Sequence, residues 1–268
     1  DAGAWWDDVV SCAISNHLWG IELLSQVPGS VGAALYINIA AYGQNIGERV
    51  LWVEVWDRAT STLRKIEQDE LVWGYKSSIF QQPENSTLVI TRAAFSLSDQ
   101  PTTKLAYQKA LDIAEETGQD IENLQARREI IIEARKRAGS LWNPQEQGNH
   151  TVGSFFRNPI VPKEIAERVM HYDESGKALA DLKKMNQVHG GDEQRVSAAH
   201  VMLASGFSRG QQWGNIKLND QNLLKIEALN GATAQEIYDV ALYVQATCKE
   251  KLGISLETEA RILGDFSH

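Results

Sequence analysis

Ser154 is the residue whose type and setting first suggest chemistry in this sequence. It stands in GSFFRNP, residues 153–159, between a flexible Gly-Ser start and an Asn-Pro end, so a loop could present its hydroxyl. A well-positioned hydroxyl can serve as a general acid. On this segment alone, however, a serine that caps a helix or stabilises a turn is the more common case.

A second candidate is PGSVG, residues 28–32. Two glycines and a small serine after a proline can expose backbone N–H groups, which form a nest that binds a pyrophosphate without any lysine. A tight turn with close packing explains the same residues about equally well. The residues alone leave both interpretations open.

Generic catalytic motifs are missing from the sequence. It contains no GxGxxG, GxxxxGK[ST] or HExxH, which disfavours a Rossmann dehydrogenase, a P-loop enzyme and a zincin. The six histidines lack metal-ligand spacing, and Cys12 and Cys248 are far apart. We therefore expect no metal site and two reduced thiols.

Five segments, taken in order, carry a resemblance. They are VPGSVGAA at 27–34, NIAAYG at 38–43, GYKSSIF at 74–80, GSFFRNP at 153–159 and LETEARILG at 256–264. Each is weak alone, but five ordered segments across nearly the whole chain are not expected by chance. Together they resemble the UDP-N-acetylenolpyruvoylglucosamine reductases, flavoenzymes of peptidoglycan precursor synthesis, in the longer form of that family.

The resemblance implies an FAD site. It places the FAD diphosphate on the PGSVG loop, with residues of the NIAAYG segment nearby. Ala40 stands where the family usually has glycine, and the added methyl could crowd backbone that approaches the flavin. The implied cofactor-binding residues are Pro28, Gly29, Ser30, Val31, Gly32, Asn38 and Tyr42.

The resemblance also implies three catalytic residues. Ser154 would protonate the carbon left as an enol or carbanion after hydride addition. Glu259 would polarise the substrate carboxylate or assist proton delivery, although a solvated glutamate is the commoner case. Lys76 stands where the family has arginine; lysine keeps the charge but loses the bidentate geometry, so we expect reduced activity.

Four further residues are implied to bind substrate. Tyr107 would close over the nucleotide sugar, although an aromatic packed on the sheet is nearly as good an explanation. Asn158 and Gln221 match positions that bind the uridine diphosphate, and Arg137 matches an arginine of the family. Ser140 replaces a lysine expected to contact the diphosphate, a loss that basic residues at 135–137 would have to offset.

The implied reaction has two halves. NADPH reduces FAD and leaves, and the enolpyruvyl ether of UDP-N-acetylglucosamine then takes hydride at one carbon and a proton from Ser154 at the next. UDP-N-acetylmuramate is the product. The alternative is a non-catalytic nucleotide-sugar or flavin-binding relative, in which Lys76, Ala40 and Ser140 record lost chemistry.

Periodicity predicts the elements that would position these residues. Alternating apolar residues predict strands at 49–57, 63–66, 87–97 and 223–227, and a terminal strand over 255–264. Helical spacing predicts a helix near the start, a helical region over 102–137 broken at Gly118, and helices at 162–172, 197–205 and 233–252. The stretch from 173 to 191 is polar, and we predict no element there.

These elements predict an α+β fold. We expect an FAD-binding domain over 1–144, a substrate-binding domain over 145–256, and a terminal strand at 257–268 that returns to the FAD domain and its flavin site. Because the sequence opens without methionine and in mid-element, we expect it to be part of a longer protein whose amino-terminal FAD subdomain is absent here.

Composition limits the partners. The chain has 268 residues, of which 43% are hydrophobic, as a packed globular protein requires. A formal charge of −9 disfavours nucleic acid and anionic membranes. Neither a signal peptide nor an apolar run of roughly 18 residues is present. We expect a cytoplasmic monomer that acts on a small nucleotide sugar.

Overall fold

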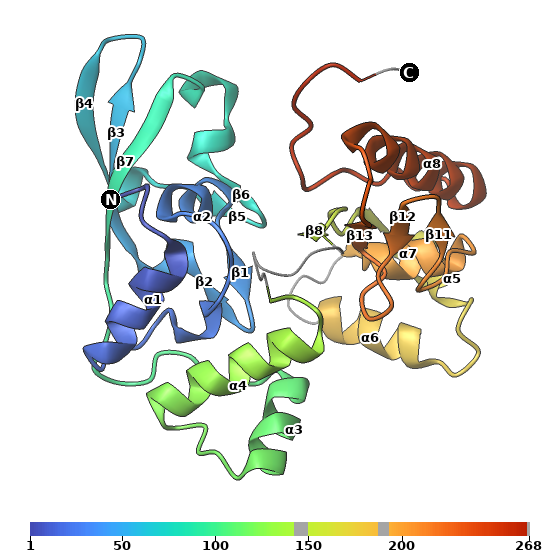
Figure 1. Cartoon of the computed structure of the whole chain (residues 1–268), viewed down its shortest axis with the longest axis horizontal. Coiled ribbons are helices and arrows are strands. Elements are labelled where there is room, and N and C mark those ends of the chain that lie inside the picture. The colour runs from blue at the N-terminus through green and yellow to red at the C-terminus, as the bar shows by residue number, and fades with distance from the viewer. Residues whose placement is uncertain (142–149, 187–192, 267–268) are drawn as a thin grey trace. The chain divides into compact units, whose positions relative to one another are not determined.

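The computed structural model describes residues 1–141, 150–186 and 193–266 (Figure 1). The chain divides into two compact units, residues 1–142 and 143–268, which are described separately. The expected domain boundary at 144–145 falls outside the described residues, so the domain assignment stays a prediction. No helix among the described residues is both long and apolar enough to cross a membrane.

The first unit contains a three-stranded antiparallel sheet. β3 (Val50–Asp57) lies between β4 (Thr62–Glu67) and β7 (Leu88–Phe95), which confirms the three strands predicted in this region. The alternation of β3 buries Val53 and Val55 completely. These valines pack with residues of α1 (Trp6–Ser15) and α2 (Val31–Ile37) in one hydrophobic core.

Short elements complete this part of the chain. Two small hairpins are formed by β1 (Ala40–Ala41) with β2 (Gln44–Asn45) and by β5 (Trp73–Gly74) with β6 (Ser77–Ser78). The 3-10 turns are η1 (Glu22–Leu24), η2 (Ile46–Arg49), η3 (Gln68–Glu70), η4 (Ile79–Gln81) and η5 (Pro83–Asn85).

Two helices end the first unit, as the break at Gly118 predicts. α3 (Gln108–Thr117) stops at Gly118, which takes the left-handed conformation with φ of 67°. α4 (Leu124–Arg137) starts at the Asn123 cap, whose side chain accepts a hydrogen bond from the Ala126 N–H. Buried residues of both helices form a second core with Leu23 and Leu105.

A buried ion pair joins η1 to α4. The Arg127 guanidinium lies 3.3 Å from the fully buried Glu22 carboxylate and is itself 1% exposed. Arg127 also donates to the carbonyls of Thr103 and Ile121 and stacks over the Trp19 ring, 4.8 Å from its centroid. One side chain therefore connects four separate segments of the first unit.

The second unit is built on a four-stranded antiparallel sheet in the order β11 (Gln212–Trp213), β12 (Ile216–Leu218), β13 (Lys225–Ala228) and β8 (His150–Ser154). A second small sheet pairs β9 (Ile160–Pro162) with β10 (Glu193–Arg195). The helices are α5 (Lys163–Met170), α6 (Lys177–Asn186), α7 (Ala198–Ala204) and α8 (Ala234–Leu252).

Most predictions for this unit are confirmed. The expected capping box forms at the start of α8, where Thr233 and Glu236 bond each other's backbone N–H groups. The helix α6 is not predicted, because the polar Asp-Glu-Ser-Gly segment just before it, residues 173–176, is typical of a loop. The terminal segment does not form a regular strand; it makes a single bridge, from Thr258 to Phe156.

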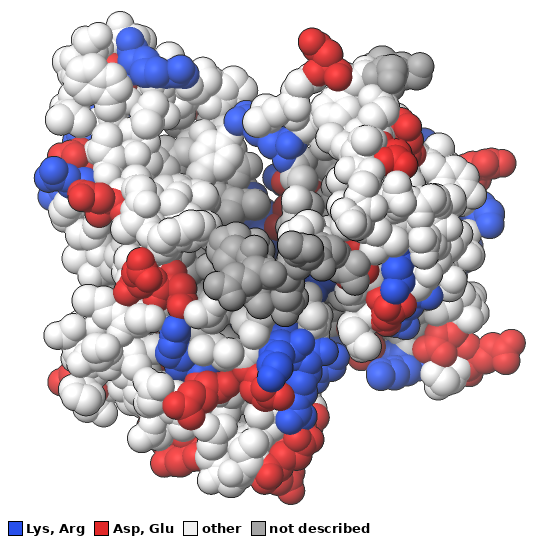
Figure 2. All heavy atoms as spheres, viewed as in Figure 1, with Lys and Arg blue, Asp and Glu red and all other residues white. Residues whose placement is uncertain are grey.

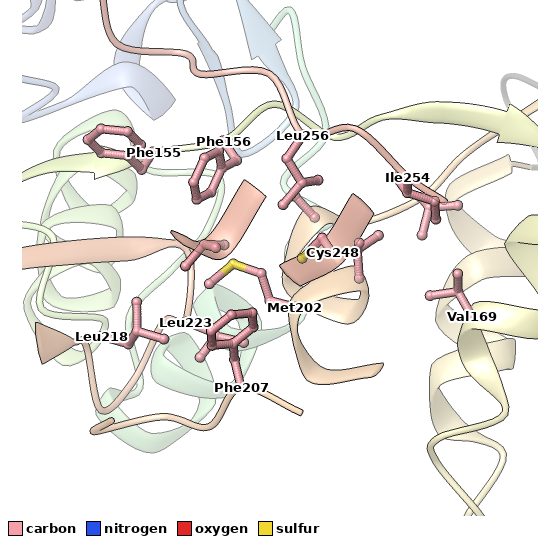
Figure 3. Close-up of a cluster of buried hydrophobic side chains, with 14 of the residues drawn as sticks. Phe155, Phe156, Val169, Met202, Phe207, Leu218, Leu223, Cys248, Ile254 and Leu256 are labelled. Atoms are coloured by element: carbon pink, nitrogen blue, oxygen red, sulfur yellow. The ribbon is translucent and has the colours of Figure 1, made fainter. Parts of the chain in front are cut away.

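One hydrophobic core holds the second unit together (Figure 3). Phe155 and Phe156 pack edge to face, with ring centroids 5.3 Å apart. Leu218 from β12, Leu223 from the turn between β12 and β13, and Cys248 from α8 lie in the same cluster. The residues that follow Ser154 are therefore anchored in the core.

Replacing Arg127 with methionine should lower the free energy of unfolding by about 3–5 kcal/mol, because Glu22 would keep a buried charge without its partner. Urea unfolding followed by circular dichroism measures the change. The matched control is Arg92→Met: Arg92 is 63% exposed and pairs with Asp1 at 3.2 Å, so its loss should cost less than about 1 kcal/mol. Equal effects of the two substitutions would contradict this role for the buried pair.

Candidate functional site

A β-bulge at the end of β8 sets the position of Ser154. Ser154 pairs with Lys225 and Thr151 pairs with Glu227, so two residues of β8, Val152 and Gly153, lie opposite the single residue between those partners. Gly153 has φ of 83°, a conformation that suits glycine. The Thr151 hydroxyl accepts a hydrogen bond from the Gly153 N–H at 3.2 Å. Bulges of this kind re-aim side chains, often beside active sites.

The segment after Ser154 is held on both sides. The Phe155 N–H donates to the Leu224 carbonyl at 2.8 Å, and the Phe155 carbonyl accepts from the Glu259 N–H at 2.8 Å. The Arg157 N–H donates to the Glu257 carbonyl at 2.9 Å. Two predicted catalytic residues, Ser154 and Glu259, are thereby brought to either side of Phe155.

Asn158 has a structural role in this arrangement. Its side-chain oxygen accepts a hydrogen bond from the Ala198 N–H at 2.9 Å, at the first turn of α7. Its carbonyl accepts from the Arg195 guanidinium at 3.3 Å. The side-chain amide nitrogen makes no hydrogen bond with another described residue, so it is the part of Asn158 that a ligand could use.

Gln221 lies at the tip of the turn between β12 and β13. The Asn219 side-chain oxygen accepts from the N–H groups of Gln221 and Asn222, at 2.8 and 2.7 Å, and this fixes the turn. Asn219 is in turn held by Glu227, whose carboxylate accepts from the Asn219 amide at 2.6 Å. The Gln221 side chain is exposed at this turn.

In the first unit, Lys76 occupies the two-residue loop of the β5–β6 hairpin, because Gly74 pairs with Ser77. Its φ of 51° lies in the left-handed region, which costs a lysine roughly 1 kcal/mol. The Gln81 side chain donates to the Lys76 carbonyl at 3.2 Å and to the Tyr36 carbonyl at 2.8 Å. Strain that the surrounding structure maintains is common at binding sites.

Asn38 fixes the same hairpin to α2. It is 1% exposed, ends α2 with φ of 53°, and donates its amide to the Gly74 carbonyl at 2.8 Å. Its side-chain oxygen accepts from the Gly47 N–H at 3.1 Å. Asn38 therefore positions the hairpin that carries Lys76, and its contact with flavin stays a prediction.

The PGSVG loop forms the start of α2. The Ser30 hydroxyl accepts from the Ala33 N–H at 3.3 Å, as an N-cap does. The Val31 and Gly32 N–H groups donate to the Ala4 and Ala2 carbonyls, at 2.9 and 2.8 Å. A diphosphate at this loop would therefore depend on donors other than those two. Pro28 is exposed at its edge.

Tyr42 and Tyr107, predicted to bind different ligands, lie together. Their ring centroids are 5.1 Å apart in an edge-to-face arrangement. Burial, together with the neighbouring Tyr42, raises the pKa of the Tyr107 phenol. Two nearby segments carry buried polar atoms without hydrogen-bond partners among the described residues, Gln44 Nε2 and Thr102 Oγ1. Such atoms are available to a polar ligand.

Arg137 is occupied by two carboxylates. It lies 2.9 Å from Glu133 and 2.7 Å from Glu116, and these pairs raise the pKa of its guanidinium. On the face drawn in Figure 2, basic and acidic side chains are interspersed over this helical part of the first unit. Arg135 is instead buried; it donates to the Ser140 carbonyl at 2.9 Å, while its Nε has no partner within the described residues.

Lys225 and Glu227 are absent from the residues that the sequence singles out. Both are buried, 3% and 6% exposed, and both lie on the strand beside Ser154. The sequence pattern could have identified them: in LLKIEAL, residues 223–229, two charged residues interrupt a strand that is otherwise apolar.

Comparison with known proteins gives a consistent result. The family model described as UDP-N-acetylenolpyruvoylglucosamine reductase, C-terminal domain, matches residues 143–263. A protein named UDP-N-acetylenolpyruvoylglucosamine reductase from Shewanella sp. (strain MR-7) is 31% identical over 264 residues, which cover 98% of this chain and 72% of the relative. One of the same name from Mycobacterium leprae (strain Br4923) is 29% identical over 273 residues, with the same coverage of both chains.

A solved structure shares the fold. It is titled as the UDP-N-acetylenolpyruvylglucosamine reductase from Thermus caldophilus, and it superposes with a TM-score of 0.56 at 20% sequence identity. The match covers 97% of this chain and 70% of that structure. This similarity supports the α+β class predicted from the sequence.

The Tyr42–Tyr107 contact can be tested by absorbance titration. The difference between the wild type and Tyr107→Phe should give a pKa for Tyr107 above the ordinary value of 10.0, because burial disfavours the phenolate. Tyr42→Ala should lower that pKa by removing a packed neighbour, and Tyr42→Phe, which keeps the ring, should lower it less. An unchanged value in Tyr42→Ala would contradict the contact.

Proposed function

The chain belongs to the UDP-N-acetylenolpyruvoylglucosamine reductase family, and from this membership we propose that it reduces the enolpyruvyl ether of UDP-N-acetylglucosamine to UDP-N-acetylmuramate. In this proposal NADPH supplies the electrons and FAD carries them. The reaction belongs to peptidoglycan precursor synthesis in the cytoplasm. The observation that supports it most is the bulged strand that places Ser154 beside the segment of Glu259.

Ser154 is the proposed proton donor. Its Oγ–H bond would break as a C–H bond forms at the substrate carbon next to the one that takes hydride, and the electron pair would remain on Oγ. Serine is a weak acid, so this role depends on a fixed geometry. The bulge at Gly153 and the two anchored phenylalanines provide that geometry, because each fixes the backbone on one side of the serine.

Glu259 is proposed to orient the substrate carboxylate or to assist proton delivery. Its N–H already bonds the Phe155 carbonyl, so its backbone moves with the segment that carries Ser154. The Glu259 carboxylate can approach the substrate carboxylate only if one of the two is protonated or a cation lies near them. The cation assigned by the family resemblance is Lys76, whose hairpin is held by Asn38 and Gln81.

FAD would supply the hydride when it is bound. Gly29 and Ser30 are the loop residues proposed to face its diphosphate, because Val31 and Gly32 have already committed their N–H groups. Tyr42 and the amide nitrogen of Gln44, which has no hydrogen-bond partner among the described residues, fit a polar part of the same ligand. The proposed roles of these residues are to bind and orient the cofactor.

The direct test follows NADPH oxidation, in the presence of FAD and the enolpyruvyl substrate, by the protein extended with the amino-terminal FAD subdomain that the resemblance implies. Turnover that yields UDP-N-acetylmuramate supports the proposal. Bound nucleotide sugar without turnover would instead favour a non-catalytic relative, the alternative suggested by Lys76, Ala40 and Ser140.

Replacing Ser154 with alanine should lower kcat by about 10²–10⁴-fold, the usual contribution of a general acid. The fold and FAD binding should persist, because β8 is held by backbone pairing with β13 and the Ser154 hydroxyl makes no hydrogen bond with another described residue. Steady-state NADPH oxidation measures kcat. A Ser154→Ala protein with kcat within about threefold of the wild type would assign the proton to another donor.

Replacing Gly153 with alanine separates positioning from stability. Alanine should resist a φ of 83° at a cost of roughly 1–2 kcal/mol, and a displaced Ser154 should lower kcat by up to about 10²-fold. Gly118→Ala is the matched control: Gly118 also has positive φ, and an added Cβ meets no described atom within 4 Å at either glycine. The control should show a similar loss of stability and normal kcat. Equal kcat values in Gly153→Ala and Gly118→Ala would contradict the role of the bulge in positioning Ser154.

Replacing Lys76 with arginine should raise kcat, since a planar guanidinium can bind a carboxylate through two hydrogen bonds. Lys76→Met should lower kcat. Lysine, arginine and methionine at position 76 would share the same positive φ, so this variant controls for the strain of the hairpin. Measurements of kcat at saturating substrate rank the wild type and the two variants. An arginine variant slower than the wild type would show that this site is adapted to lysine.

A further inference from the structure

The face of the sheet that carries Ser154 also carries buried charge. Along β12 and β13 the side chains alternate: Ile216, Leu218 and Ile226 enter the core of the second unit. Lys225 and Glu227 therefore point to the opposite face, together with Lys217, which pairs with Glu227 across the two strands. Burying an ammonium is costly unless it is compensated, and Lys225 is 3% exposed.

Lys225 is the cross-strand neighbour of Ser154. The two residues lie directly opposite each other in the antiparallel register. The adjacent hydrogen bond runs from the Phe155 N–H to the Leu224 carbonyl, which makes Ser154 and Lys225 a non-hydrogen-bonded pair. In such pairs the side chains leave the same face, with Cβ atoms about 4.5–5.5 Å apart. A lysine chain from this position can bring its ammonium to the serine oxygen.

The neighbouring groups make a buried cation tolerable. Glu227 is two residues along the same strand and on the same face, and its carboxylate is fixed by Asn219 at 2.6 Å. Lys217, on the same face, pairs with Asp220 at 2.5 Å. The strand register, by contrast, places Lys225 beside Ser154.

We propose that Lys225 is a positioning residue for the reaction, acting through Ser154. This proposal rests on the proposed function, in which Ser154 gives its proton to a substrate carbon. As the Oγ–H bond breaks and the C–H bond forms, negative charge develops on Oγ. The Lys225 ammonium stabilises that oxygen by donating a hydrogen bond, and the solvent proton that restores the hydroxyl completes the cycle.

The test is a double-mutant cycle between the two residues. Lys225→Met should lower kcat on the order of 10²-fold in the wild-type background, the usual loss for one donor to a developing oxyanion. In the Ser154→Ala background the same change should alter kcat less than about twofold, because there is no serine oxygen to stabilise. A purely structural lysine would lower kcat by a similar factor in both backgrounds, and that result would overturn the proposal.

Two further variants keep the test informative. Lys217→Met is the matched control on the same sheet face, and it should leave kcat within about twofold of the wild type. If Lys225→Met fails to fold, Lys225→Arg takes its place: it should lower kcat in the wild-type background and have no added effect with Ser154→Ala. A Lys225→Arg effect that is equal in both backgrounds overturns the inference.

The outcomes for the two proposals are distinguishable. Wild-type turnover that is lost in Ser154→Ala supports the proposed function, whatever Lys225 does. An unchanged kcat in folded Lys225→Met would then overturn this inference alone. Absence of wild-type turnover would overturn the proposed function and this inference with it.

Discussion

The pairing of β8 with β13, and the extra residue that interrupts it, is the constraint on which the site depends. In a regular antiparallel ladder, without the extra residue, strict alternation of side chains along β8 would decide to which face of the sheet Ser154 points. The bulge at Gly153 changes that alternation just before the serine, and the core position of Phe155 and Phe156 prevents the segment from relaxing. The backbone of the carboxy-terminal segment then bonds to the far side of Phe155 and brings Glu259 with it. Interactions between residues far apart in the sequence thus position Ser154 and Glu259, which come from opposite ends of the second unit.

The first unit positions its candidate residues differently. They lie on short hairpins and turns, which have little hydrogen bonding of their own, so buried polar side chains hold these segments in place. Asn38 holds the Lys76 hairpin against α2, and Arg127 joins Glu22 to the loops that precede α3 and α4. Asn38 bonds the Gly74 carbonyl and the Gly47 N–H, and Arg127 bonds the Glu22 carboxylate and two carbonyls, so the loss of either side chain would leave more than one group unpaired.

Patterns of residues close together in the sequence predicted part of the regular structure, but not β8, β11 or β12 of the second unit's sheet. The strands at β3, β4 and β7, the break at Gly118 and the capping box of α8 each follow from residues close together in the sequence. α6 was missed because the polar Asp-Glu-Ser-Gly segment before it, residues 173–176, is typical of a loop, and the terminal segment was predicted as a strand because its partner could not be known. The site shows the same limit. The GSFFRNP motif identified Ser154, but the bulge, the occupied donors of PGSVG and the carboxylates around Arg137 depend on residues distant in sequence.

The central claim is that Ser154 is the proton donor placed by the bulged strand. An experimental structure of the chain with FAD and the enolpyruvyl substrate bound tests it most directly. We predict that the Ser154 Oγ lies about 3–3.5 Å from the substrate carbon next to the one that takes hydride, as a reacting pair requires. A serine oxygen well beyond that range, with another acid or an ordered water in its place, would contradict the claim.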